Sequence, residues 1–233
     1  MDVFVGTSGY SYKAWKGAFY PPDLPDKDML PWYAARLPAV EINSSFYRMP
    51  RAAMLEAWAG LVPAGFKFAL KAPQRITHRQ RLQDVDDSVS YLVEVAAALK
   101  EKQGPLLFQL PPRFSKDAPR LGAFLDRLPA SCPVAFEFRH PSWFDEEVLH
   151  ILSQHQAALC IVEDENGLEV PAKATADWGY LRLRREDYDE DRLEAWASWI
   201  AAQDWREVFV FFKHEDQAIG PRLAQRFLDL TSS

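Results

Sequence analysis

Charged and amide side chains interrupt several short apolar segments of this sequence, each time near the end of the segment. The residues concerned are Glu41, Asn43, Lys71, Gln109, Glu137, Arg139 and His140. An ionised group in a desolvated place costs several kcal/mol unless it is paired. We therefore expect these groups to satisfy one another in one place. Such a cluster is either an ion-pair network with a purely structural role or a site for a small polar ligand.

If these groups surround a ligand, they suit acid-base chemistry. Glu41 or Glu137 would donate or accept a proton, while Lys71 and Arg139 would stabilise developing negative charge. His78 follows the apolar segment 66–71 within the basic run QRITHRQRL, where it would carry a proton or hold an anion. The leading hypothesis is an enzyme that acts on a small anionic or sugar-like molecule.

Two other classes of protein stay open. Arg75, Arg79 and Arg81 flank His78, and a basic cluster of this kind beside aromatic side chains could bind nucleic acid or cleave phosphodiesters. The net charge of −6 counts against that alternative, so nucleic acid is not the favoured partner. The third alternative is a barrel that binds a ligand without turnover. The oligomeric state does not follow from the sequence.

The sequence has no motif for an organic cofactor. It lacks the dinucleotide fingerprint GxGxxG, the phosphate loop GxxxxGK[ST] and the nucleophile elbow GxSxG. His78, His140 and His214 follow apolar segments, and His214-Glu215-Asp216 would add oxygen ligands, so a divalent metal stays open. It is not favoured, because no HxH or HExxH spacing fixes a ligand set.

Eight short apolar segments alternate with amphipathic stretches along the chain. The expected strands are 3–6, 39–43, 66–71, 105–110, 134–138, 158–162, 179–183 and 207–212. The expected helices are 27–37, 51–60, 86–102, 116–128, 142–156, 189–203 and 217–230. Alternating strands and helices predict a parallel sheet covered by helices. Eight units of about 29 residues favour a closed (β/α)8 barrel of the TIM type over an open doubly wound sheet.

The barrel interpretation explains why the polar residues stand where they do. Active sites of such barrels lie where the strands end, so the loops that follow the strands should also contribute. The first of these loops, GTSGYSYKAW, offers backbone amides at Thr7 and Ser8 for an anion, and Tyr12 and Trp15 as a stacking wall. Gly167 and Pro171 break the segment between 163 and 177, so we expect an irregular crossover there.

Composition places the chain among folded globular proteins. It is 48% hydrophobic and 26% charged, and we expect one domain over residues 1–233. There is no 18-residue apolar run and no leader at the N-terminus, so no membrane partner is expected and the predicted location is the cytoplasm. Cys132 and Cys160 lack metal-ligand spacing and are expected to be buried thiols.

Five linked motifs resemble, in order and spacing, the YecE-like family known as domain of unknown function 72. The motifs are GTSGYSYKAW, VEINSSFYRMP, PAGFKFALKAPQRITHRQRL, LLFQLPPRF and FEFRHPSW, within a match from Val3 to about Phe227. The resemblance implies a TIM-barrel fold and a description as related to sugar isomerases. It singles out Gly6, Thr7, Ser8, Gly9, Trp15, Glu41, Asn43, Phe46, Tyr47, Arg48, Lys71, Thr77, His78, Gln109, Glu137, Arg139, His140, Ser142 and Trp143. Arg182 is a further candidate for binding the ligand.

Two segments depart from the family pattern. Members similar to this chain read R-x-H-G after the seventh strand, where this sequence has Arg182, Leu183, Arg184 and Arg185. After the eighth strand they show an asparagine pair, whereas this chain has Lys213 and His214. We therefore expect this member to bind a different ligand or to have lost an activity.

Overall fold

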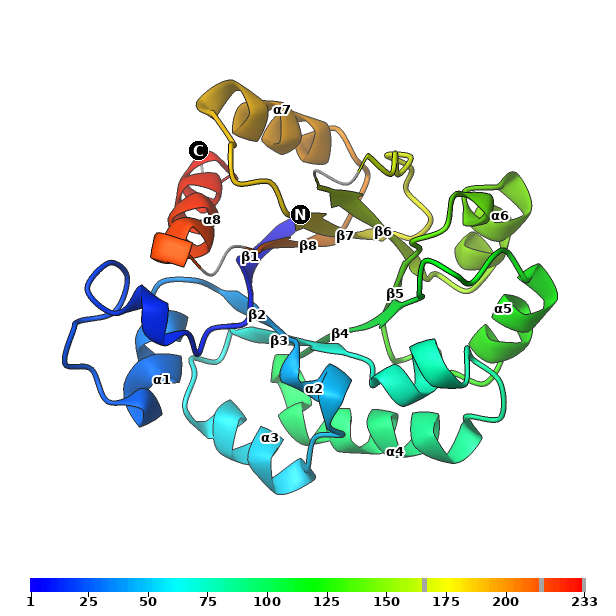
Figure 1. Cartoon of the computed structure of the whole chain (residues 1–233), viewed down its shortest axis with the longest axis horizontal. Coiled ribbons are helices and arrows are strands. Elements are labelled where there is room, and N and C mark those ends of the chain that lie inside the picture. Colours follow the sequence, from blue (N-terminus) through cyan, green and yellow to red (C-terminus); the bar gives the residue numbers. More distant parts are fainter. Residues whose placement is uncertain (165–166, 214–215, 232–233) are drawn as a thin grey trace.

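Eight parallel strands close into a barrel in the order of the chain (Figure 1). The computed structural model describes residues 1–164, 167–213 and 216–231. The strands are β1 Asp2–Ser8, β2 Ala39–Ile42, β3 Lys67–Lys71, β4 Gln103–Gln109, β5 Val134–Glu137, β6 Ala158–Glu163, β7 Trp178–Leu183 and β8 Glu207–Phe212. β1 pairs with β8 in parallel and closes the ring. The predicted (β/α)8 barrel is therefore confirmed.

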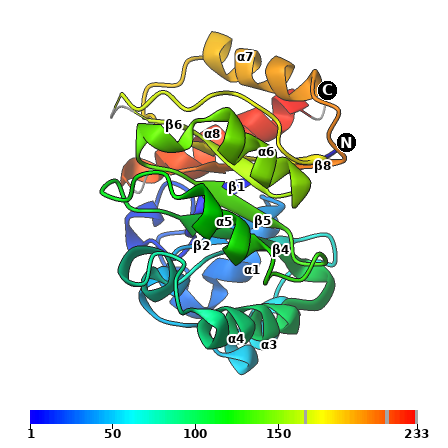
Figure 2. The same cartoon turned by 90° about the vertical axis from the view of Figure 1, so that its right-hand side faces the viewer.

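Helices surround this barrel on the outside (Figures 1 and 2). They are α1 Met29–Ala34, α2 Ser44–Tyr47, α3 Ala52–Gly60, α4 Asp86–Ala96, α5 Ala118–Leu125, α6 Glu146–Gln154, α7 Glu190–Ala201 and α8 Ile219–Thr231. Three of them begin after an aspartate whose carboxylate accepts a hydrogen bond from a backbone N–H of the first turn, namely Asp117, Asp145 and Asp189. No helix in the described part of the chain is long and apolar enough to cross a membrane.

Some predicted helices are shorter than their periodicity suggested. The stretch 86–102 forms α4 and then continues as the 3-10 segment Ala97–Lys102, in which Lys100 has a positive φ of 54°. The stretch 142–156 starts within a 3-10 turn, Pro141–Trp143, and α6 begins only at Glu146. The crossover between β6 and β7 contains no helix within residues 164 and 167–177, as expected.

The barrel interior nearer the amino ends of the strands is filled by an apolar layer of small and aromatic side chains. Alanines of β2, β3, β5 and β6 leave space that rings from β7 and β8 fill, and the group comprises Ala39, Ala69, Leu107, Ala135, Ala158, Cys160, Trp178, Tyr180, Phe209 and Phe211. Gly6 allows β1 to approach β2, because a Cβ there would lie 1.9 Å from the carbonyl oxygen of Ala39. Cys132 and Cys160 are both free and buried, as predicted.

The same strands turn polar toward their carboxyl ends. Side chains at i and i+2 point to the same face of a strand. The next inward positions after the apolar layer are therefore Glu41, Lys71, Gln109, Glu137 and Arg182. The barrel itself thus places these five side chains in one layer.

Candidate functional site

One buried arginine connects the two glutamates of this polar layer. Arg182, at the end of β7, donates from Nη2 to Glu41 Oε1 at 2.8 Å and from Nη1 to Glu137 Oε2 at 2.5 Å. All three side chains are almost fully buried. Burial alone would lower the pKa of Arg182, but the two carboxylates outweigh it and raise that pKa well above its usual range. Arg182 is therefore a permanent cation between two anions.

The remaining oxygen atoms of these glutamates are also occupied. Glu41 Oε1 accepts from Ser8 Oγ at 2.7 Å, and Glu41 Oε2 accepts from the Tyr180 hydroxyl at 2.7 Å. Glu137 Oε1 accepts from Gln109 Nε2 at 2.8 Å and from Arg139 Nε at 2.9 Å. Every carboxylate oxygen in the layer thus already accepts a hydrogen bond.

The charges around Glu137 keep it ionised. Burial by itself would raise its pKa, but the positive charges of Arg182 and Arg139, together with the hydrogen bond from Gln109, hold the pKa well below its usual range. A carboxylate in this state is a poor proton carrier near neutral pH. Its hydrogen bonds with Arg139 and Arg182 instead suit a residue that holds these two side chains in position.

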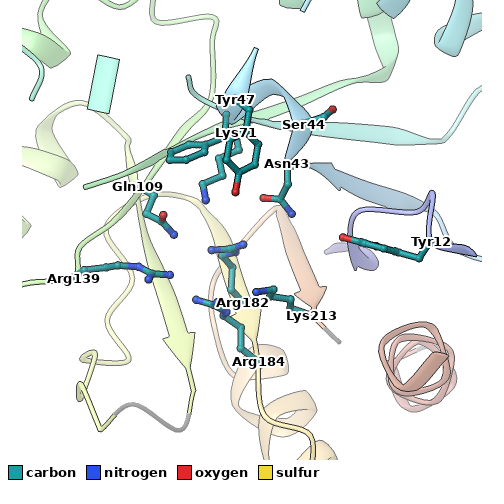
Figure 3. A pocket seen from close by; sticks show the side chains of 11 residues that line it. Tyr12, Asn43, Ser44, Tyr47, Lys71, Gln109, Arg139, Arg182, Arg184 and Lys213 are labelled. Carbon is teal, nitrogen blue, oxygen red and sulfur yellow. The ribbon is translucent and has the colours of Figure 1, made fainter. Parts of the chain in front are cut away.

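A cavity of about 360 Å³ lies over this network (Figure 3). Figure 3 shows polar ends from several strands converging on one space, among them those of Lys71, Asn43, Gln109, Arg139 and Arg182. The lining residues are Tyr12, Asn43, Ser44, Phe46, Tyr47, Lys71, Gln109, Arg139, Arg182, Arg184 and Lys213. We call this space the mouth cavity. It combines five cationic side chains with two amides, and none of its lining residues is acidic.

A second cavity of about 320 Å³ adjoins the first at Arg139, which lines both. Glu137 contributes to this second cavity beside Phe138 and Asp164, although its side chain is only 1% exposed. Leu168 and Val170 from the crossover after β6 form an apolar wall. The acidic side of the network thus faces the second cavity, and the basic side faces the mouth cavity.

Lys71 ends β3, and its amine faces the mouth cavity. Its Nζ lies 4.3 Å from the centroid of the Phe46 ring. Within the described residues, this nitrogen makes no hydrogen bond and has no carboxylate within 4.0 Å. Burial and the nearby charge of Arg182 lower the pKa of Lys71 to about 8, against the opposing effect of Glu137 and Glu41. The amine therefore exchanges protons close to neutral pH.

Arg184 follows β7 and lines the same cavity. Its Nη1 lies 4.0 Å from Glu137 Oε1 and 3.9 Å from Asp164 Oδ2, distances at which charges attract but no hydrogen bond forms. Nε and Nη1 of Arg184 and Nε of Arg182 are buried donors without an acceptor in the described part of the chain. A fourth such atom, Trp205 Nε1, belongs to a ring that packs against Gly179 at the start of β7. Three of the four thus belong to side chains that line the mouth cavity.

His78 lies beside the cavity rather than in its wall. It belongs to a short π-helical turn, Arg75–Arg79, and its ring contacts Phe46 edge-on with centroids 4.9 Å apart. Its Nδ1 is 2.9 Å from Thr77 Oγ1. Burial is the main factor that lowers the pKa of His78, and the positive charges of Lys71 and Arg139 lower it further. The basic neighbours do not join the cavity: Arg75 donates to Gln80, and Arg81 stands near the Phe114 ring.

The structure divides the residues expected at the site into three groups. Those that line the mouth cavity are Tyr12, Asn43, Tyr47, Lys71, Gln109, Arg139 and Arg182. Those that lie buried next to its floor are Ser8, Glu41 and Glu137. Those that point elsewhere or lie outside its wall are Trp15, Arg48, His78, His140 and Trp143. Thr7 is buried too, but it belongs with the third group, because its hydroxyl points to the Gly9 carbonyl oxygen and Tyr33 Oη on the other face of β1. One pole of the barrel thus brings together four side chains from three strands and a strand end, namely Glu41, Lys71, Glu137 and Arg139.

Local packing explains why part of the third group does not reach the cavity. His140 accepts from the backbone N–H of Ser142 and so caps the short turn Pro141–Trp143. The Trp143 indole is fully buried, stacks on Phe138 with centroids 4.8 Å apart and donates to the Phe114 carbonyl at 2.6 Å. Trp15 is likewise buried against Tyr20 and Phe19. These rings support the loops after β1 and β5 instead of facing a ligand.

Two cations of the cavity were noted in the sequence only as departures from the family pattern. Arg184 stands two residues after Arg182, and Lys213 stands two residues after Phe211, which is an interior residue of β8. The period of two along a strand could have placed both in the barrel mouth. His214 and Glu215, proposed as metal ligands, lie outside the described residues. Within the residues that the structure describes, no three His, Cys, Asp or Glu side chains form a group that could hold a metal ion.

Comparison with known sequences identifies relatives over nearly the whole chain. The model of a family described as protein of unknown function DUF72 matches residues 4–233. The UPF0759 protein YunF of Bacillus subtilis is 25% identical over 233 aligned positions, which cover 93% of this chain and 80% of that protein. The UPF0759 protein YecE of Escherichia coli K12 is 32% identical over 113 residues, or 48% of this chain and 42% of that protein.

Solved structures agree with the fold. A DUF72 family protein from Thermotoga maritima superimposes with a TM-score of 0.86 and 26% identity, and the match covers all of both chains. A DUF72 family protein from Enterococcus faecalis has a TM-score of 0.82 at 19% identity, covering 99% of this chain and 96% of that one. The second likeness concerns the fold alone. Together these matches confirm the resemblance read from the five motifs.

Proposed function

The chain belongs to the DUF72 family of proteins of unknown function, and we propose that it is an enzyme that binds a small anionic, sugar-like molecule in the mouth cavity and acts on it by proton transfer. The observation that carries this proposal is the set of three buried guanidinium N–H groups, on Arg182 and Arg184, that donate to no atom of the described residues. An unsatisfied buried donor costs about 1–3 kcal/mol, and more when it is charged. An oxyanion in the cavity would remove that cost.

The charges around the cavity favour an anionic ligand. The groups that interact most closely are the cations Lys71, Arg139, Arg182 and Arg184 and the carboxylates Glu41, Glu137 and Asp164. Within this group of seven side chains one positive charge is therefore left over. Because the carboxylates lie under or beside the cavity rather than in its wall, a ligand would meet the basic side of the network first. Guanidinium groups bind carboxylate and phosphate oxygens through paired N–H donors.

The size and the neutral polar groups of the cavity fit a molecule that carries hydroxyl groups. A volume of about 360 Å³ lies at the small end of the range for ligand pockets. The amides of Asn43 and Gln109 and the hydroxyls of Tyr47 and Ser44 line it. These groups both donate and accept hydrogen bonds, as sugar hydroxyls require. A sugar-like anion is therefore the substrate class that we propose.

Lys71 is the group best placed to move a proton. A general acid or base works best when its pKa lies near the working pH, and the pKa of Lys71 is about 8. The two glutamates were expected to do this work, but each of their oxygens already accepts a hydrogen bond from the protein. In our proposal Glu41 and Glu137 hold Arg182 in place, and His78, which packs against the Phe46 ring outside the cavity wall, takes no part in the proton transfer.

Binding of anions to a matched pair of variants tests the anion site. We expect inorganic phosphate and ribose 5-phosphate to raise the melting temperature of the wild-type protein, and ribose without phosphate to do so less. Arg184→Gln should weaken phosphate binding at least tenfold. Arg185→Gln is the matched control, since Arg185 pairs with the exposed Asp187 and does not line the cavity. Equal binding by both variants would remove the cavity from the proposal.

Exchange of a carbon-bound proton tests the reaction. Ribose 5-phosphate, incubated with the protein in deuterated water, should lose the NMR signal of the proton next to its carbonyl carbon. Lys71→Met should abolish this exchange, while Lys67→Met, on the same strand, should not. A wild-type protein that binds ribose 5-phosphate without exchanging the proton would contradict proton transfer on that sugar and favour binding without turnover.

A further inference from the structure

We propose that Lys71 acts as a nucleophile that forms an imine with a carbonyl carbon of the anionic ligand in the mouth cavity. The inference rests on the function proposed above and narrows its substrate class to carbonyl compounds that carry an anionic group. Three properties of the cavity support it: the position of the amine, the state of its charge, and the groups that surround it.

The amine of Lys71 is held at the cavity wall without an oxygen partner. Lys67, on the same strand, donates to the Glu101 carbonyl oxygen, and Lys102 donates to two carbonyl oxygens. Lys71 instead places its Nζ over the Phe46 ring, with no acceptor for it within the described residues. Its nitrogen is therefore available to a molecule that enters the cavity.

The backbone around Lys71 is anchored, so the amine starts from a defined place. Ser45 Oγ lies 2.7 Å from the Lys71 carbonyl oxygen and 2.8 Å from the Ile42 carbonyl oxygen. This hydroxyl links α2 to the ends of β2 and β3. Because Phe46 belongs to α2, the same contact also positions the ring below the amine.

Burial and the charge of Arg182 favour the neutral form of the Lys71 amine, which is the form that a nucleophile needs. Burial and Arg182 lower the pKa of Lys71 to about 8, so about one amine in ten is unprotonated at pH 7. Lysines that form imines are activated in this way, by desolvation or by a neighbouring cation. Arg139 adds to the effect of Arg182, whereas Glu137 and Glu41 oppose it.

The reaction balances without any further reagent. The Lys71 lone pair attacks the carbonyl carbon, a C–N bond forms as the C–O π bond breaks, and the amine passes one of its protons to the oxygen. The resulting carbinolamine takes up one proton from water, which replaces the proton that the Lys71 ammonium released before the attack. The C–O bond then breaks, water leaves, and an iminium ion remains. The positive charge of the iminium makes the proton on the adjacent carbon more acidic. In this reaction Lys71 promotes the proton transfer as an iminium instead of acting as its base, and water accepts the proton. Arg184 and Arg182 would hold the anionic group, and the amides of Asn43 and Gln109 line the space where the carbonyl oxygen would lie.

Trapping with a reducing agent distinguishes a nucleophile from a general base. Glyoxylate carries an aldehyde next to a carboxylate, and cyanoborohydride converts its imine with lysine into a stable carboxymethyl group. We expect peptide mass mapping of the wild-type protein to find Lys71 modified at least tenfold faster than Lys67 or Lys13. Lys13 is the reference for a solvated amine, since its side chain is 82% exposed. The rate at Lys71 should rise with pH and level off above about pH 8.

Two controls make the result decisive. Inorganic phosphate should slow the modification of Lys71 and leave that of Lys13 unchanged. Acetaldehyde, which has no anionic group, should show a smaller preference for Lys71 over Lys13 than glyoxylate does. Because the readout is the modified peptide of the unaltered protein, no variant has to fold. Equal rates at Lys71 and Lys13 would overturn the imine, as would a Lys71 rate that phosphate does not affect.

The two proposals fail in different ways. If phosphate stabilises the protein and Arg184→Gln weakens that effect, but Lys71 is not trapped, then the imine is wrong and anion binding stands. If phosphate has no effect on the melting temperature, the function proposed above is wrong whatever the trapping shows.

Discussion

Replacing Lys71 by methionine should make the protein more stable. The folded state lowers the pKa of this amine from its ordinary 10.5 to about 8, chiefly through burial and the charge of Arg182. Each pKa unit corresponds to about 1.4 kcal/mol. Holding the charged amine in the cavity therefore costs the folded protein about 3 kcal/mol near neutral pH. Methionine has a similar length and no charge, so Lys71→Met should recover about 2–3 kcal/mol in the free energy of unfolding.

The stability gained by Lys71→Met should decrease as the pH rises. Below about pH 8 the amine is charged in both the folded and unfolded states, and the whole cost is present. Between pH 8 and 10.5 the unfolded chain binds more protons than the folded one, so the stability of the wild-type protein rises relative to that of the variant. The difference should vanish above about pH 10.5.

Urea unfolding at pH 7, 9 and 10 measures both effects. In a protein of this size, 2–3 kcal/mol corresponds to a rise of roughly 4–12 °C in melting temperature. Lys67→Met is the matched control: its amine donates to the Glu101 carbonyl oxygen, so its removal should cost about 1 kcal/mol and show no convergence at alkaline pH. If Lys71→Met is less stable than the wild-type protein at pH 7, the charge of Lys71 is not strained in the cavity and the reasoning is wrong.

Two further predictions concern the buried network. Glu137→Gln should destabilise the protein by about 3–5 kcal/mol in urea unfolding at pH 7, since it leaves Arg182 with one carboxylate in a buried place; a loss below 1 kcal/mol would contradict this. Because the folded state lowers the pKa of Glu137, its contribution is complete above pH 4.5 and is lost as the pH falls through the lowered value, so this variant and the wild-type protein should converge in acid. Tyr180→Phe should cost about 1–3 kcal/mol, because it removes the donor to Glu41 Oε2; a neutral effect on unfolding would show that this bond adds no net stability.

Local patterns along the chain were enough to predict the barrel. Short apolar segments, separated by amphipathic stretches, correspond to all eight strands, and the segment 207–212 matches β8 at both ends. Alternation with a period of two reports which face of a strand is buried, and this property depends only on neighbouring residues. Helix ends were less predictable, because caps such as Asp145 and turns such as Pro141–Trp143 compete with the apolar periodicity.

The same patterns predicted a polar cluster at the strand ends but not its internal arrangement. Which carboxylate meets which cation depends on distances between residues that lie far apart in the chain, as in the bond from Arg182 to Glu41, 141 positions away. Only closure of the barrel brings these groups together, and only packing shows that Trp143 faces the core while Arg184 faces the cavity. The sequence alone thus determined the eight strands, most of the helices and the kinds of charge at the barrel mouth, whereas α2, Ser44–Tyr47, was not predicted. The tertiary structure decided which charges neutralise one another and which face the mouth cavity, because hydrogen bonds and desolvation act over a few ångströms in space whatever the distance along the chain.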